Sequence, residues 1–130
     1  MAKRALRIAF RIPPYASGRR LQWRRDIHAA AVHACRRAGV SYEAADRLEV
    51  RVRLYMDADL LSIHDVDNRA KDVLDALQGR AGGSKRLRAL SAVIPNDSQV
   101  HRLVIEKTPP PKQARGLGHV LVRRVSGRAV

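Results

Sequence analysis

The sequence predicts an α/β (α+β) fold, in which two main helices pack on a mixed β-sheet. Three observations support this prediction. Two segments alternate apolar and polar residues with the period of a β-strand, two others have the spacing of amphipathic helices, and short strands are expected after them. A chain of 130 residues can bury one core, so we expect a single domain over residues 1–130. Strand order stays open, although the first strand–helix–strand unit could be parallel.

The first half of the chain contains three predicted elements. Residues 6–12 alternate apolar side chains with arginine or alanine, which is typical of a half-buried strand, and a Pro-Pro pair follows them. Residues 21–38 carry an apolar stripe at helical spacing, and Gly39 fits the end of that helix. Residues 48–56 alternate again and predict the second strand, which is the clearest element of the sequence.

The second half of the chain predicts one helix and several short strands. Residues 68–78 carry an apolar face at helical spacing, and Gly79 follows them. Residues 80–90 form a basic segment with a Gly-Gly pair, and residues 108–118 form a connector that contains proline and glycine. Short strands are expected at residues 93–94, 100–106 and 119–125.

Charge is the most informative part of the composition. Lysine and arginine total 26 and aspartate and glutamate total 12, which gives a net charge of +14. Such an excess favours a polyanionic partner, and we expect nucleic acid; a solubilising surface or ribosome association is the alternative. We expect no membrane partner, because no apolar run is long enough to span a bilayer. The single cysteine, Cys35, excludes an internal disulfide and fits a reducing, cytoplasmic location.

Two carboxylates, Asp65 and Asp67, stand one residue apart just before the second predicted helix. In extended chain they project to the same side, and a helix that begins near Asn68 places both at its positive end. Neighbouring carboxylates of this kind suit Mg²⁺, with Mn²⁺ as a substitute. The alternative is that one of them only caps the helix. An EF-hand calcium loop is excluded, because Ala70 stands where that loop needs glycine and Ala76 where it needs glutamate.

The face of this helix opposite the apolar stripe is polar and could be a plain solvated surface. It contains Asn68, Lys71, Asp72 and Asp75. Lys71 lies one turn beyond Asp67 and could reach the same metal or a bound phosphate. Asp97, in a turn between two apolar runs, offers a third carboxylate, although an ordinary Asn-Asp turn explains it equally.

Two blocks of sequence together resemble the RusA family of Holliday junction resolvases. The first block is Asp65-x-Asp67-Asn68-x-x-Lys71-x-x-x-Asp75-Ala76-Leu77, and the second is Asn96-Asp97-Ser98-Gln99-Val100. The family reads D-x-D-N-x-x-K, then D-A-L, then D-D-x-Q after a short strand. The match covers residues 65–107 well and the N-terminal half in outline; its parts are short, but they agree jointly in order and residue type.

The resemblance implies a Mg²⁺-dependent endonuclease that resolves four-way DNA junctions by paired nicks, in recombination and repair. It places the metal-binding aspartates at Asp65, Asp67 and Asp97 and the essential lysine at Lys71. It also implies a homodimer, for which the last predicted strand, residues 119–125, could be an edge that pairs with its copy. Nucleases of other branched DNA, such as flaps and forks, and a catalytically idle nucleic-acid-binding relative remain alternatives.

The chain departs from the family pattern in three places. Asn96 replaces the first aspartate of the D-D pair, and His64 stands where the family often has a basic residue. The segment between the D-A-L block and the second block is longer than usual, because it holds the basic Gly-Gly segment. We expect Lys85, Arg86 and Arg88 of this segment to contact DNA phosphates; the alternative is that their charges only aid solubility. The resemblance assigns no role to Asp75 or Gln99.

Overall fold

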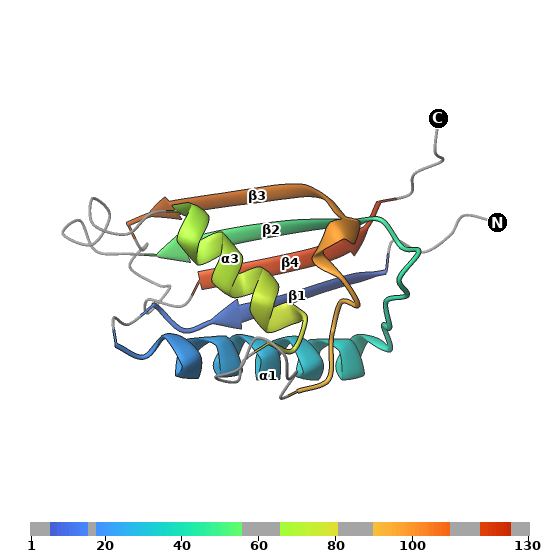
Figure 1. Cartoon of the computed structure of the whole chain (residues 1–130), viewed down its shortest axis with the longest axis horizontal. Helices are drawn as coiled ribbons and strands as arrows, with labels where there is room; N and C mark the ends of the chain where they lie inside the picture. The colour runs from blue at the N-terminus through green and yellow to red at the C-terminus, as the bar shows by residue number, and fades with distance from the viewer. Residues whose placement is uncertain (1–5, 16–17, 56–65, 81–89, 110–117, 126–130) are drawn as a thin grey trace.

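The structure is a computed structural model that describes residues 6–15, 18–55, 66–80, 90–109 and 118–125. Within these residues it confirms the predicted α+β fold, with a four-stranded mixed sheet and two helices (Figure 1). The elements are, in chain order, β1 (Arg7–Ile12), α1 (Arg20–Ala38), β2 (Leu48–Tyr55), α3 (Val66–Leu77), the short 3₁₀ helix η1 (Asp97–Gln99), β3 (Val100–Thr108) and β4 (Gly118–Arg124).

The strand order of the sheet is β1-β4-β2-β3. Strand β4 is antiparallel to both β1 and β2, whereas β3 is parallel to β2. Strands β1 and β2 therefore run in the same direction with β4 between them. The prediction that residues 119–125 form an edge strand is wrong, because β4 is paired on both sides. The edges of the described sheet are β1 and β3.

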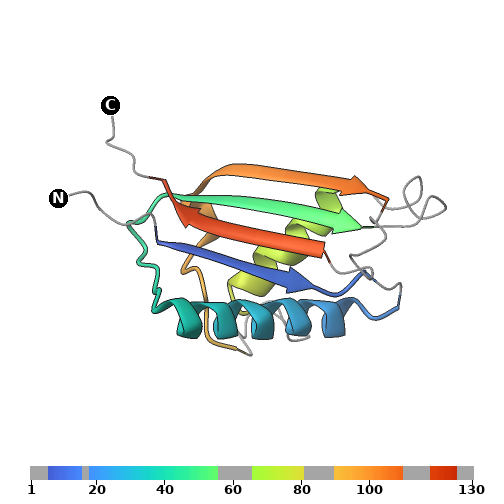
Figure 2. The same ribbon diagram turned by 180° about the vertical axis from the view of Figure 1, so that it is seen from behind.

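One face of the sheet is apolar and is covered by the helices. Helix α3 crosses this face, and α1 lies along β1 and contacts α3 (Figure 1). The core between them holds Ile8, Val50, Val52, Val120 and Val122 from the strands, and Ile27, Ala31, Val73, Ala76 and Leu77 from the helices. Viewed from behind, the strands lie in front of α3, and no helix of the described chain crosses the other face (Figure 2).

Two differences from the sequence prediction affect the surroundings of α3. Residues 93–94 form no strand; both are buried, and the backbone N–H groups of Val93 and Ile94 donate to the Leu77 carbonyl at 2.7 and 3.0 Å. The chain after α3 therefore satisfies the end of that helix instead of joining the sheet. Helix α3 begins at Val66, two residues earlier than predicted, so Asp67 lies in its first turn and not in extended chain.

Gly79 ends α3 and allows the chain to return across it. Its φ is +79°, in the left-handed region, and a Cβ at this position would collide with the Leu90 carbonyl oxygen. A side chain here would push the segment 90–95 away from the helix end. Among the described helices, none is long and apolar enough to cross a membrane.

Candidate active site

A hollow of about 520 Å³ lies between α3 and β3 and brings together residues from both blocks of the motif. Its apolar part comes from Ala70 and Leu74 of α3 and from Leu103 and Ile105 of β3. Its polar part contains three carboxylates and one lysine, which are Asp67, Lys71, Asp75 and Asp97. Three of the four residues that the sequence assigned to catalysis therefore line one cavity.

Helix α3 positions Asp67 and Lys71 one turn apart. Both side chains are exposed, and residues four apart lie on the same face of a helix. The Asp67 carboxylate also accepts a hydrogen bond from the backbone N–H of Asn68 at 3.0 Å. Since Asp67 lies in the first turn, the positive end of the helix dipole stabilises its negative charge.

A capping box holds Asp97 at the start of η1. The Asn96 side chain accepts from the Ser98 N–H at 2.9 Å, and the Gln99 side chain accepts from the Asn96 N–H at 2.9 Å. The Gln99 side-chain amide also donates to the carbonyls of Glu43 and Asp46, at 2.8 and 2.9 Å. Asn96 thus supplies the acceptor oxygen that a cap needs, as aspartate would, and leaves the carboxylate of Asp97 exposed.

Gln78 joins this turn to α3. Gln78 is 1% exposed; its Nε2 donates to the Leu74 carbonyl at 3.2 Å and its Oε1 accepts from the Asp97 N–H at 3.3 Å. The two blocks of the motif are therefore connected through a buried amide. The sequence prediction did not single out Gln78, and its position directly after the D-A-L block was the available signal.

A buried charge network lies behind the hollow, between α3 and α1. Asp72 is fully buried, so the expectation that it belongs to a solvated face is wrong. Its Oδ1 accepts from Arg20 at 2.6 Å and from Arg24 Nη2 at 2.7 Å. The Arg69 Nε lies 3.2 Å from Asp72 Oδ2 in an ion pair that lacks hydrogen-bond geometry. The Arg69 guanidinium also stacks over the Tyr15 ring, 3.7 Å from its centroid.

Arg24 extends this network to the hollow through Asp75. The Arg24 Nη2 lies 3.2 Å from Asp75 Oδ2, and both side chains are largely buried. The Asp75 carboxylate is therefore neutralised by a neighbouring arginine. Asp67 and Asp97, in contrast, have no ion pair with any described residue.

The remaining predicted site residues lie outside the described part of the chain. They are Asp65 of the metal set and Lys85, Arg86 and Arg88 of the basic segment. Among the described residues, no group of three histidine, cysteine, aspartate or glutamate side chains is arranged to hold a metal ion. No protein-family model matches the sequence, and no curated protein matches it either.

Proposed function

We propose that this protein is a metal-dependent endonuclease of the RusA type, which cuts branched DNA such as four-way junctions. The observation that carries the proposal is the pairing of the carboxylates around the hollow. Asp72 and Asp75 are neutralised by arginines, whereas Asp67 and Asp97 are exposed and have no arginine partner within the described chain. Of the three aspartates that line the hollow within the described chain, the two without an ion pair are Asp67 and Asp97, which the motif assigns to the metal together with Asp65.

The donor set suits Mg²⁺ or Mn²⁺. Carboxylate oxygens are the ligands that these hard cations prefer, and Asp67 and Asp97 line the same hollow. Together with Asp65, they would hold the cation. When bound, it would supply positive charge at a phosphate oxygen and a more acidic water.

The chain's own residues supply the other requirements of phosphodiester hydrolysis. Water adds to phosphorus while one P–O bond breaks, and negative charge grows on the phosphate oxygens. Lys71 is exposed in the hollow and would neutralise this charge with its ammonium group. Asp75 would orient Arg24 and keep α1 against α3, and so act as a positioning residue.

Paired nicks in opposed strands need two active sites, so the proposal includes a homodimer. Because β4 lies inside the sheet, the dimer would have to use another surface. Within the described chain, β1 lies beside α1, whereas β3 has no neighbour on its outer side and exposes Leu103. The outer edge of β3 is therefore the surface that we assign to the second copy. A monomeric mass at micromolar concentration with junction cleavage intact would contradict the dimer.

The decisive experiment measures cleavage and binding on the same substrates. Purified protein is incubated with labelled four-way junction, flap, fork and linear duplex, with Mg²⁺, Mn²⁺ or EDTA. We expect metal-dependent cleavage that is fastest on the junction, and loss of cleavage with retained binding in Asp65→Asn, Asp67→Asn and Asp97→Asn. Asp26→Asn, an exposed change on α1, is the matched control and should cut normally.

Each of the other outcomes of this experiment supports one of the alternative functions. Cleavage fastest on flaps or forks would assign the protein to those substrates. Binding without cleavage in either metal would identify a nucleic-acid-binding relative that lacks activity. Nicking at wild-type rate by any of the three aspartate variants would remove that residue from the metal set.

A further inference from the structure

The face of the sheet that no described helix covers is a regular array of charged side chains. Residues in register across the sheet share one face, which places twelve side chains together in three rows of four. The rows are Arg7-Arg123-Glu49-Arg102, Ala9-Leu121-Arg51-Val104 and Arg11-His119-Arg53-Glu106. The array contains six arginines against two glutamates, an excess of four positive charges.

Both glutamates pair with arginines and leave them accessible. Glu49 is 1% exposed and accepts from Arg51 and from Arg123, whose Nη2 lies 2.7 Å away. Glu106 accepts from Arg53 Nε at 2.6 Å. The side chains of these three arginines are still about half exposed, so their remaining N–H groups face solvent. Fixed, exposed guanidinium groups are well suited to phosphate oxygens.

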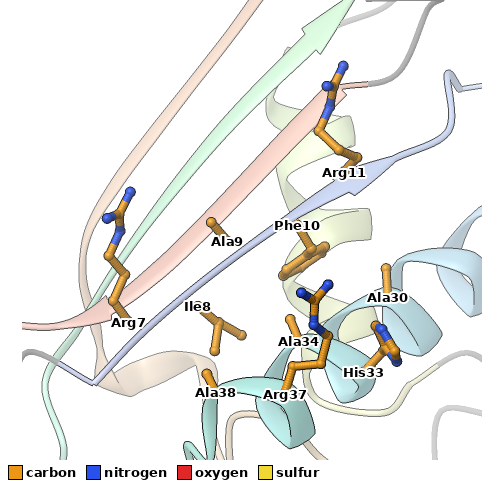
Figure 3. A pocket seen from close by; sticks show the side chains of 10 residues that line it. All are labelled: Arg7, Ile8, Ala9, Phe10, Arg11, Ala30, His33, Ala34, Arg37 and Ala38. Atoms are coloured by element: carbon orange, nitrogen blue, oxygen red, sulfur yellow. The ribbon is translucent and has the colours of Figure 1, made fainter.

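The basic surface continues around the β1 edge of the sheet. A groove of about 590 Å³ lies between β1 and α1, with Arg7 and Arg11 on the strand and His33 and Arg37 on the helix (Figure 3). Its apolar lining includes Phe10 and alanines of α1, and no aspartate or glutamate is among the described residues that line it. The positive surface therefore extends from β3 across the sheet and past its far edge.

We propose that the open face of the sheet binds the phosphate backbone of a DNA duplex without reading its sequence. The choice of DNA as the polyanion rests on the proposed function, whereas the choice of a polyanion rests on the array itself. Side chains alternate along β3, so Arg102 and Val104 face the open side, and Leu103 and Ile105 face the hollow with Asp67 and Asp97. The surface is therefore a second contact region, separate from the catalytic hollow.

The side chains of the array favour a duplex over a single strand. None of its twelve residues is phenylalanine, tyrosine or tryptophan. Proteins that bind single strands use such rings as platforms for stacking bases, whereas duplex backbones are held mainly by arginine, lysine and polar groups. Tyr55 follows Arg53 on the same face, but it is 8% exposed and makes an edge contact with His119, so its ring offers little surface for stacking a base. In a branched substrate, this face would hold an arm away from the cut.

Three exposed arginines of the array can be changed without disturbing buried Glu49. The test variant is Arg7→Gln, Arg53→Gln and Arg102→Gln combined. The matched control is Arg19→Gln, Arg25→Gln and Arg36→Gln combined, which removes the same charge from exposed positions of α1 and its N-cap. Binding to a short labelled duplex is measured in EDTA over a salt series, so that the result does not depend on cleavage.

The test variant should bind the duplex about tenfold more weakly or worse at low salt, and its log–log salt slope should be shallower by ~2.7, or ~0.9 for each lost contact. The control should keep the wild-type slope, and Lys at the three test positions should restore it. Equal losses in both variants would show a general charge effect and overturn the proposal. Unchanged binding with an altered oligomeric mass would overturn it in favour of a protein partner on this face. Either result leaves the nuclease proposal standing. Absence of cleavage by the wild-type protein would overturn the nuclease proposal and leave this one standing, because duplex binding in EDTA does not depend on cleavage.

Discussion

The Gln78 side chain, directly after α3, accepts a hydrogen bond from the backbone N–H of Asp97 at 3.3 Å. Gln78→Met preserves volume and removes this acceptor. The capping box of Asn96 and Gln99 remains, so the fold should survive with a loss of about 1 kcal/mol in the free energy of unfolding. Because Asp97 is no longer fixed against α3, we expect kcat for junction cleavage to fall about tenfold or more with DNA affinity unchanged.

The control for this change is Gln22→Met, because Gln22 is an exposed side chain of α1 whose amide donates to Asp26. It should leave kcat and stability near wild type. A normal kcat in Gln78→Met would show that the capping box alone positions Asp97. Equal losses of kcat and affinity would instead point to a general disturbance of the fold.

The two helices and four strands of the described fold could be predicted because each depends on local periodicity, whereas the strand expected at residues 93–94 does not form. Helix α1 and strand β2 are within a residue or two of their predicted bounds. Strand order could not be predicted, since it depends on pairing between distant segments. Strand β4 inserts between β1 and β2 and makes both of its pairings with residues far away in the chain. An exposed edge and an inner strand of this length look alike in sequence.

The residues that line the hollow could be predicted, but the buried residues that hold them in position could not. The spacing of Asp67, Lys71 and Asp97 matches the family motif, so these three residues could be identified from the sequence. The burial of Asp72 depends on Arg20 and Arg24, which come from a helix about 50 residues earlier. On α3 alone, Asp72 lies among polar neighbours and resembles a solvated residue. The available signal was the pair of arginines four residues apart, on one face of α1.

Asp72→Asn tests the buried network. The change leaves Arg24 and Arg69, which are 13% and 9% exposed, without their central anion. Removing one partner from a buried ion pair leaves uncompensated charge, so we expect the free energy of unfolding to fall by about 3–5 kcal/mol. Urea unfolding of the full chain measures it.

The control for Asp72→Asn is Asp26→Asn on the exposed side of α1, which should stay within about 0.5 kcal/mol of wild type. If Asp72→Asn does not fold, Arg69→Met in the same background should restore folding in part, because it removes one of the unpaired charges. A loss in Asp72→Asn no larger than in the control would show that water solvates the three arginines.

The basic segment gives a third prediction, from sequence alone. Changing Lys85, Arg86 and Arg88 together to alanine should weaken junction binding most at low salt. Each phosphate contact that is lost should flatten the log–log salt slope by ~0.9. The substrate concentration for half-maximal cleavage should rise, with the maximal rate unchanged. An unchanged affinity and slope would show that these charges serve solubility only.

The pH dependence of stability tests whether the carboxylate of Glu49 holds the arginines of the open face. Hydrogen bonds from Arg51 and then Arg123 lower the pKa of Glu49 below its ordinary value of 4.5, in opposition to burial. Because the folded-state pKa is the lower one, ionised Glu49 stabilises the fold fully above a pH of 4.5. This contribution is lost as the pH falls through the folded-state pKa.

Glu49→Gln should therefore lower the free energy of unfolding by about 1.5–3 kcal/mol at neutral pH, the value typical of hydrogen bonds to a charged group. The difference from wild type should shrink as the pH falls below 4.5, because protonated glutamate and glutamine then carry the same charge. Glu106→Gln is the control, since its carboxylate is 53% exposed and its pair with Arg53 is worth little. Urea unfolding over an acid series measures both variants. A difference for Glu49→Gln that stays constant with pH would mean that the side chain acts by packing, and its two arginines would then be held by other contacts.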